Sequence, residues 1–329
     1  MLFPKFWLNS KSNPSLLTYI LYPISIIWLV LGKLHQKCTP SKKCPIPIIC
    51  VGNITIGGNG KTPTALKLRS LLQNLGYKPH ILSHGYLANL KGPHLVNPKK
   101  DSFISVGDEA LMMAFYGPTW IARNRYSGIK AAVASGANVI IMDDGFQNST
   151  IKKDFSLLII ETSIGFGNGY AIPAGPLREQ ISSGFKKADF TVTIGDRTDQ
   201  YNFRKDNSFI NKIPNLQGRL VAQCDKFDLK KQNVIGFAGI AHPMKFKNTL
   251  EKLGANIIKF KAFTNHKPFK NKDLTDLVNA AEKQKALLIT TEKDFVRIPK
   301  YLQRKIHVLR VELELQNQDF LLKKIMAIL

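Results

Sequence analysis

The hydrophobic residues of this chain gather in short runs that alternate with helix-like segments from Ile46 onward. Runs typical of buried strands lie at 46–51, 78–82, 120–122, 139–142, 156–161, 190–194, 234–238, 257–263, 286–290 and 305–313. Helical patterns lie at 63–75, 107–115, 125–135, 243–253 and 272–283. Because strands that alternate with helices form mostly parallel sheets, the pattern predicts an α/β fold with a P-loop-type α/β/α domain and a second, smaller α/β domain.

Three parts are predicted from changes in composition along the chain. Residues 1–35 form an N-terminal membrane-anchoring helix, 36–222 a nucleotide-binding kinase domain, and 223–329 a C-terminal α/β domain. A length of 329 residues is enough for about two domains, each with its own core. The polar stretch 195–216, rich in Asn and Lys, is interpreted as a linker or exposed connection.

The longest apolar stretch lies at 16–31, inside a segment from Ser12 to Gly32 without a charged residue. It is short for a membrane-spanning helix, which needs about 20 residues, and Pro23 would kink it. No small-residue cleavage site of a signal peptide follows it. We expect a membrane anchor that dips into or crosses the bilayer, with a buried core helix as the alternative.

The net charge of +24 implies an anionic partner. The basic residues are spread along the chain rather than gathered in an aromatic-rich tract, so a nucleic-acid partner is not expected. Anionic membrane lipids and a phosphorylated substrate remain, and no obligate protein partner is inferred. The four cysteines form no CxxC pair and are interpreted as reduced thiols.

A glycine-rich run stands between the first predicted strand and helix. Its members expected to bind a nucleoside triphosphate are Thr55, Gly57, Gly58, Asn59, Gly60, Lys61 and Thr62. Backbone N–H groups of such a loop point at one anion, while the lysine reaches phosphate and the threonine hydroxyl reaches Mg²⁺. Thr55 stands where the usual pattern has glycine, and Gly57-Gly58 supplies the turn instead.

Two aspartates, Asp143 and Asp144, end the apolar strand at 139–142. Aspartate at a strand end also caps turns, but beside a P-loop it can hold Mg²⁺. Another run, Thr291-Glu292-Lys293-Asp294, is similar to the guanine-selective [NT]KxD motif, yet its lysine falls one place late. We therefore assign this run no role in reading a base.

Together, the P-loop, the run DDGFQ at 143–147, Gly167-Asn168-Gly169 and the run PAGPLRE at 173–179 resemble the tetraacyldisaccharide 4′-kinase family of Gram-negative bacteria. The resemblance covers nearly the whole chain, and PAGPLRE combined with GGxGKTP is highly specific. It implies transfer of the ATP γ-phosphate to the 4′-hydroxyl of a tetraacylated glucosamine disaccharide 1-phosphate. It also implies Mg²⁺ and a place at the cytoplasmic face of the inner membrane.

The resemblance also implies residue roles. Asp108 and His266 match the catalytic pair, Lys61 and Arg125 further catalytic positions, and the metal positions are Thr62, Asp143, Asp144 and Glu179. A sugar hydroxyl is a poor acid, so a carboxylate must take its proton as the new bond to phosphorus forms. The alternatives are that Asp108 caps a helix and that His266 is structural.

Three positions depart from the family pattern: His84 replaces the arginine of SRGY, Asn148 a histidine and Asn265 an aspartate. At position 84 a fixed charge is lost, because histidine is only partly protonated near neutrality. A different class of protein, a membrane-bound P-loop ATPase that acts as a switch or partitioning protein, is the rival hypothesis. It would need no base for an acceptor alcohol.

Overall fold

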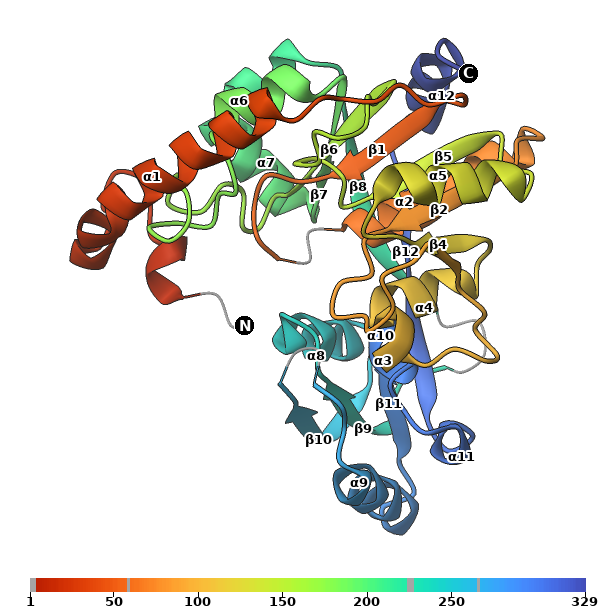
Figure 1. Cartoon of the computed structure of the whole chain (residues 1–329). Helices are drawn as coiled ribbons and strands as arrows, with labels where there is room; N and C mark the ends of the chain where they lie inside the picture. The colour runs from red at the N-terminus through yellow and green to blue at the C-terminus, as the bar shows by residue number, and fades with distance from the viewer. Residues whose placement is uncertain (1–3, 58–59, 224–227, 265–266) are drawn as a thin grey trace.

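The sheet of this protein is continuous across the chain in a computed structural model, which describes residues 4–57, 60–223, 228–264 and 267–329. Within these residues it has twelve strands in the order β10-β9-β11-β12-β8-β7-β6-β1-β5-β2-β4-β3 (Figure 1). The strands are β1 (Ile48–Gly52), β2 (Pro79–Ser83), β3 (His94–Leu95), β4 (Thr119–Ile121), β5 (Val139–Asp143), β6 (Phe155–Glu161), β7 (Phe190–Ile194), β8 (Asn215–Gln223), β9 (Asn233–Ala238), β10 (Asn256–Ala262), β11 (Leu287–Thr291) and β12 (His307–Leu315). Only the β3–β4 and β8–β12 pairs of this sheet are antiparallel, so the predicted mostly parallel α/β fold is confirmed.

Helices cover both faces of the sheet (Figure 1). They are α1 (Leu16–Cys38), α2 (Lys61–Asn74), α3 (Phe103–Val106), α4 (Asp108–Ala114), α5 (Arg125–Ala134), α6 (Ile181–Lys187), α7 (Arg197–Asp206), α8 (Pro243–Lys252), α9 (Asn271–Lys283), α10 (Glu292–Phe295), α11 (Lys300–Gln303) and α12 (Gln318–Met326). Two short 3₁₀ helices are η1 (Lys5–Leu8) and η2 (Ser208–Lys212).

Strand β1 is central to the sheet and carries the P-loop at its carboxyl end. It pairs in parallel with β5 and β6 and is buried along its whole length. Ile48 and Cys50 pack into the core on one face, whereas Ile49 and Val51 pack with Leu68 of α2 on the other. Burial on both faces explains why this strand has an unbroken apolar run rather than an alternating one.

The expectation of a linker at 195–216 is wrong. Residues of this stretch form α7, η2 and the start of β8. Strand β8 pairs in parallel with β7 and antiparallel with β12, with Leu220 opposite Leu313, so it joins the two halves of the chain in one sheet. The division into domains at 222/223 stays a prediction; β1 to β7 precede that point, β9 to β12 follow it, and the point falls at the last residue of β8.

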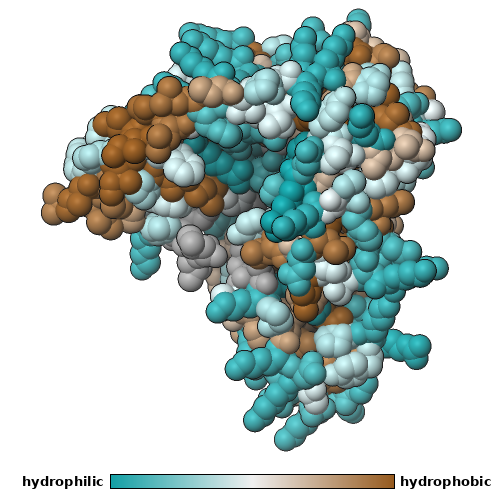
Figure 2. Space-filling view, in the orientation of Figure 1, coloured by the Kyte–Doolittle hydropathy of each residue, from teal (hydrophilic) through white to brown (hydrophobic). Residues whose placement is uncertain are grey.

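Helix α1 is largely exposed although it is apolar. It has 23 residues, only 11% of its most apolar 18-residue window is buried, and its length and composition suit a membrane-crossing helix. Only Thr18 and Ser25 are buried, while Ile20, Ile27 and Leu31 are about 60% exposed. Figure 2 shows the resulting brown ridge along α1. The alternative of a buried core helix is therefore wrong, and the exposed face supports membrane association.

Candidate active site

The P-loop lies between β1 and α2 and opens into a cavity of about 1650 Å³. Gly60 precedes α2 with a φ of 79°, and Lys61 Nζ donates a hydrogen bond to the carbonyl of Gly57 at 3.1 Å. Lys61 thus reaches back across the loop, and Thr62 lines the same cavity. Because a helix N-terminus carries partial positive charge, this end of α2 suits a phosphate group. Gly58 and Asn59 lie outside the described residues.

The PAGPLRE run forms backbone hydrogen bonds with the segment that begins the P-loop. The Ile56 amide donates to the Pro176 carbonyl at 2.9 Å, and the Arg178 amide donates to the Ile54 carbonyl at 2.7 Å. Between these bonds, Thr55 forms an isolated antiparallel bridge with Leu177. Thr55, which replaces the usual first glycine of the P-loop, is therefore buried against this run. The two backbone hydrogen bonds on either side of it hold the P-loop segment and the PAGPLRE run together.

Helix α1 packs on the other side of the same run. Ser25 Oγ donates to the Ala171 carbonyl at 2.9 Å and accepts from the Ala174 amide at 3.1 Å. Trp28 Nε1 donates to the Arg178 carbonyl at 3.0 Å. The apolar helix and the P-loop are thus connected through one intervening segment.

Asp143 ends β5 with a side chain buried to 2% exposure. Its Oδ1 accepts no hydrogen bond from any described residue. Burial, with the negative charges of Glu109 and Asp144, raises the pKa of Asp143 to about 7, although Lys61 and Arg125 oppose the shift. A buried carboxyl group without a partner is costly, so Asp143 is suited to a cation that enters the cavity.

Asp144 follows with a φ of 49° and faces two cations. Arg178 Nη1 lies 2.9 Å and Lys61 Nζ 3.8 Å from Asp144 Oδ1. Burial by itself would raise the pKa of Asp144, but Lys61 and Arg178 outweigh it and hold the pKa below its ordinary value. Asp144 is therefore ionised at neutral pH.

The oxygen atoms at this end of the cavity fit Mg²⁺. The described residues contain no cluster of three His, Cys, Asp or Glu side chains that could hold a metal by themselves. Mg²⁺ is usually bound by one or two carboxylates together with phosphate oxygens. Asp143, with its unpartnered Oδ1, Asp144 and the Thr62 hydroxyl line the cavity and match that set.

Arg125 begins α5 and is only 4% exposed. It donates to the carbonyls of Leu82 and Asp143, each at 3.4 Å, and so links the ends of β2 and β5. His84 lines the cavity nearby, and burial followed by the charges of Arg125 and Arg123 lowers the pKa of His84. The position that departs from the family pattern therefore carries little charge here.

Glu179 contacts residues other than the predicted metal ligands. Its Oε2 accepts from Lys187 at 2.6 Å and its Oε1 from Gln147 at 3.1 Å, and Gln147 also donates to the Asn53 carbonyl. Glu179 is not among the residues that line the cavity. Its predicted role at the metal stays a prediction, while its contacts join the PAGPLRE run to α6.

Asp108 is the first residue of α4, after Gly107 with a φ of 87°. It is buried, and its Oδ1 accepts from the Glu109 amide at 2.9 Å. The carboxyl group thus binds one open amide of the first turn, but the cap residue of α4 is Gly107 and no side chain caps this helix, so Asp108 is not its N-cap. Glu109 itself lines the cavity. His266, its predicted partner, lies outside the described residues.

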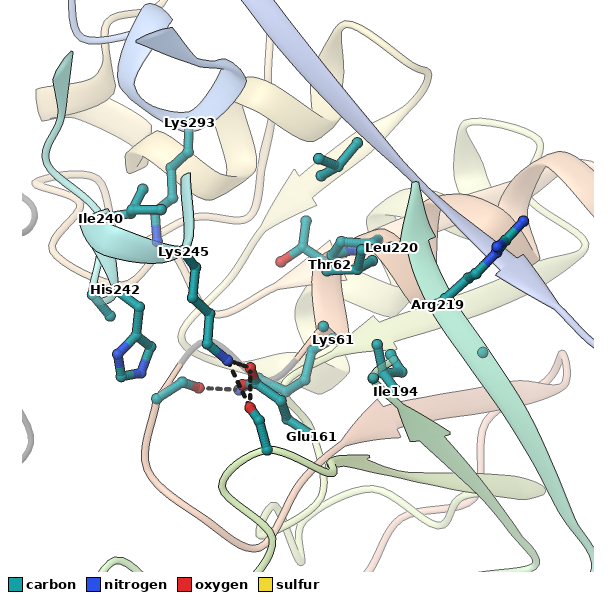
Figure 3. Close-up of a pocket in the computed structure, with 18 of the residues that line it drawn as sticks. Lys61, Thr62, Glu161, Ile194, Arg219, Leu220, Ile240, His242, Lys245 and Lys293 are labelled. Carbon is teal, nitrogen blue, oxygen red and sulfur yellow. Dashed lines mark hydrogen bonds and ion pairs between the residues drawn. The ribbon is translucent and has the colours of Figure 1, made fainter. Parts of the chain in front are cut away.

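One cluster in the cavity was not anticipated from the sequence. Lys245 of α8 pairs with Glu161 at the end of β6 and donates to Ser163 Oγ at 2.8 Å (Figure 3). This contact connects the C-terminal half of the chain to the strand beside β1. Glu161 ends an apolar strand just as Asp143 does, so the same strand-end rule would have found it.

A phosphate loop at the carboxyl edge of a parallel sheet, with two aspartates on the adjacent strand, defines a P-loop nucleotide-binding protein. The model of the family "Tetraacyldisaccharide-1-P 4′-kinase" (LpxK) matches residues 17–329. The chain belongs to this family, and it is a kinase rather than an ATPase switch.

Relatives and a solved structure agree with this assignment. The chain is 42% identical over 314 residues to the tetraacyldisaccharide 4′-kinase of Paramagnetospirillum magneticum, covering 94% of each chain. It is 39% identical over 321 residues to that of Rhodospirillum centenum, covering 97% of this chain and 94% of the relative. The crystal structure of LpxK from Aquifex aeolicus in complex with ATP superposes with a TM-score of 0.78 at 26% identity, covering 95% of this chain and 99% of that one.

Proposed function

We propose that this protein transfers the γ-phosphate of ATP to the 4′-hydroxyl of a tetraacylated glucosamine disaccharide 1-phosphate. The observation that carries the proposal is that one cavity brings together Lys61, Thr62, Asp143 and Asp144 and extends to Glu109, next to Asp108. The family name supplies the acceptor, and the relative from Aquifex aeolicus binds ATP.

In this proposal the P-loop half of the cavity binds the triphosphate. Lys61 and the amides at the start of α2 would hold the β- and γ-phosphates, and Thr62, Asp143 and Asp144 would hold Mg²⁺. Bound Mg²⁺ supplies charge neutralisation on the phosphate oxygens. Arg125 keeps the ends of β2 and β5 in register, which fixes the direction of Asp143.

Asp108 is proposed as the base on the acceptor side. The 4′-oxygen attacks the γ-phosphorus, the bond from that phosphorus to the bridging oxygen of ADP breaks, and the 4′-hydroxyl proton passes to the Asp108 carboxylate. His266 is proposed to orient that proton transfer. Glu179 supports the site through Gln147, which contacts the backbone just before the P-loop.

The acceptor is proposed to arrive from the cytoplasmic face of the inner membrane. The exposed apolar residues of α1 would enter the lipid, and Lys33, Lys37, Lys42 and Lys43 follow them in the chain, where they would meet anionic headgroups. Since α1 packs on the segment that braces the P-loop, the site would lie close to the membrane surface.

Phosphoryl transfer tests the proposal directly. Purified full-length protein in detergent, with γ-labelled ATP, Mg²⁺ and the disaccharide 1-phosphate, should label the lipid. Lys61→Met should abolish the label, whereas Lys67→Met, on the same helix outside the cavity, should not. ATP hydrolysis that is indifferent to the lipid and leaves it unlabelled would refute the function.

Asp108→Asn tests the base. Loss of a general base should lower kcat by about 100-fold or more and leave ATP affinity nearly unchanged. If nucleotide affinity collapses instead, Asp108 acts in the fold or at the metal.

A further inference from the structure

The run Thr291-Glu292-Lys293-Asp294, which has no role in reading a base, occupies a junction between the two halves of the chain. Strand β11 ends at Thr291, whose Oγ1 accepts from the Asp294 amide at 3.2 Å and so caps the short helix α10. Helix α10 contacts α4, the helix that begins with Asp108 (Figure 1). The side chains of the run point in two directions from this junction.

Towards the core, Asp294 and Arg297 form an ion pair with no solvent exposure. Asp294 Oδ2 accepts from the Gly239 amide at 3.0 Å. Arg297 donates to the carbonyls of Gly239 at 2.9 Å and Lys267 at 3.0 Å, and its guanidinium lies 4.7 Å from the ring centre of Phe269. The pair thus holds the loop after β9 against the segment that begins at Lys267, the residue that follows His266 in the chain.

Towards α4, two other side chains of the run make contacts. Lys293 Nζ donates to Glu109 Oε1 at 2.8 Å, and Glu292 accepts from the Tyr116 hydroxyl. Lys293 is one of the residues that line the cavity (Figure 3). Burial lowers the pKa of Arg297 and the negative charge of Asp108 raises it, so Asp108 lies within electrostatic reach of the guanidinium.

A buried ion pair is a poor way to gain stability, because the two charges lose their hydration. An apolar pair of similar volume would stabilise this core as well or better. The charged pair instead makes hydrogen bonds to the carbonyls of Gly239 and Lys267 and to the Gly239 amide. These backbone groups belong to segments that are far apart in the sequence. Its presence here calls for a reason other than stability.

We propose that Arg297, fixed by Asp294, is a positioning residue for phosphoryl transfer, which holds the backbone at Gly239 and Lys267 against the first turn of α4. This inference rests on the proposed function, in which Asp108 takes the proton of the acceptor and His266 orients it. The guanidinium contacts neither substrate nor phosphate in this role. It sets the distance between α4, which carries Asp108, and the described segment that begins at Lys267.

The consequence is a specific kinetic signature. Misplacement of a reacting group by about 1 Å is enough to lower a rate about 100-fold. ATP affinity depends on the P-loop, which lies on the other half of the chain, so it should not change. A purely structural residue would instead lower stability, ATP affinity and rate together.

The decisive variant removes both charges and keeps the volume. Arg297→Met alone leaves a lone buried carboxylate and is expected to lower Tm strongly. Asp294→Asn with Arg297→Met leaves no lone charge and keeps an acceptor for the Gly239 amide. We expect this double variant to unfold near the wild-type Tm, to bind ATP within about 3-fold of wild type, and to show a kcat lowered about 100-fold.

Arg297→Lys provides a second measurement that does not depend on the double variant. Lysine preserves the charge beside Asp294 but cannot hold both carbonyls, so kcat should fall about 10-fold at an unchanged ATP affinity. Lys305→Met, which breaks the exposed ion pair with Glu282 in the same half, is the matched control and should leave kcat unchanged.

The outcomes separate the two proposals. If wild-type protein phosphorylates the lipid and the well-folded double variant does so at the wild-type rate, Arg297 does not position the site and the inference is overturned. Loss of ATP affinity in step with kcat would overturn it as well. If wild-type protein does not phosphorylate the lipid, the proposed function fails, and this inference fails with it.

Discussion

Arg178 Nη1 lies 2.9 Å from Asp144 Oδ1, and this ion pair lines the cavity beside the P-loop. The Arg178 amide meanwhile donates to the Ile54 carbonyl, and its own carbonyl accepts from Trp28 of α1. One residue therefore connects Asp144, the segment between β1 and the P-loop, and the exposed apolar helix α1. The residues on either side of Arg178 in the sequence give no indication of these contacts.

Arg178→Gln should lower kcat/KM for ATP about 10-fold, equivalent to about 1.4 kcal/mol. Glutamine has nearly the length of arginine but not the charge that holds Asp144 in place and lowers its pKa. Steady-state kinetics at saturating lipid provide the measurement. Arg304→Gln, at an exposed position, should behave as wild type, and equal losses in the two variants would contradict the assignment.

In the absence of metal and nucleotide, Asp143→Asn should raise the unfolding free energy of the protein at alkaline pH. The pKa of Asp143 is about 7 in the fold against an ordinary 3.8, so ionisation destabilises the fold progressively as pH rises from about 4 to 7. The variant should exceed wild type in unfolding free energy by up to roughly 4 kcal/mol at pH 8, and the excess should vanish near pH 4. Urea unfolding with a chelator at both pH values measures the difference.

The matched control for this experiment is Asp276→Asn, at an exposed position on α9. It should change the unfolding free energy little at either pH. A stabilisation by Asp143→Asn that stays constant between pH 4 and pH 8 would show that burial of the charge is not its cause.

Gly60→Ala should weaken ATP binding at least 10-fold. Its φ of 79° disfavours any side chain, and an added Cβ would lie 2.5 Å from Ile194 Cδ1, so either the Ile194 side chain or the loop must shift. Gly76→Ala is the control, since Gly76 has a φ of 86° but no atom within 4 Å of the added Cβ. It should lose about 1 kcal/mol of stability and bind ATP normally; equal loss of binding would point to strain alone.

Replacing Ile20, Ile27 and Leu31 with serine should release the protein from anionic vesicles. Each of these side chains is about 60% exposed on α1, and burying a large apolar side chain contributes about 1.5–3 kcal/mol, so the partition coefficient should fall at least 100-fold. ATP affinity should persist, because the contacts of Ser25 and Trp28 remain.

A vesicle flotation assay provides the measurement. Leu75→Ser combined with Phe115→Ser removes exposed apolar residues from other surfaces and should leave binding unchanged. Full retention of the α1 variant on vesicles would move the anchor to the basic surface. Deletion of residues 1–35 is a poorer test, because it also removes the contacts that support the PAGPLRE run.

Most strands and helices of the fold were predictable because their apolar runs are strong local signals. Helix α7 escaped because only two of its residues, Gln200 and Phe203, are buried, so it carries almost no periodic pattern. Strand β8 was not predicted because one of its two partners, β12, lies more than eighty residues further along the chain, although the other, β7, lies close before it. Helix α12 was missed for a related reason: its buried residues Leu321 and Ile325 pack in the core cluster that includes β7, which is far away in the sequence.

The sequence by itself determined the phosphate loop and the aspartate pair, because both are written in contiguous residues that follow a buried strand. A helix N-terminus must follow Gly60, and a carboxylate must emerge where β5 ends beside β1. The apolar helix α1 was also predictable from the sequence, since its composition alone distinguishes it from the rest of the chain.

Only the tertiary structure decided which charges meet. The partners Arg178 and Asp144, and Lys293 and Glu109, are brought together by the order of strands and not by their spacing along the chain. It also directed Glu179 to Lys187 and left one face of α1 uncovered. Ion pairs form over a few ångströms in space, whereas sequence patterns report only the few residues on either side.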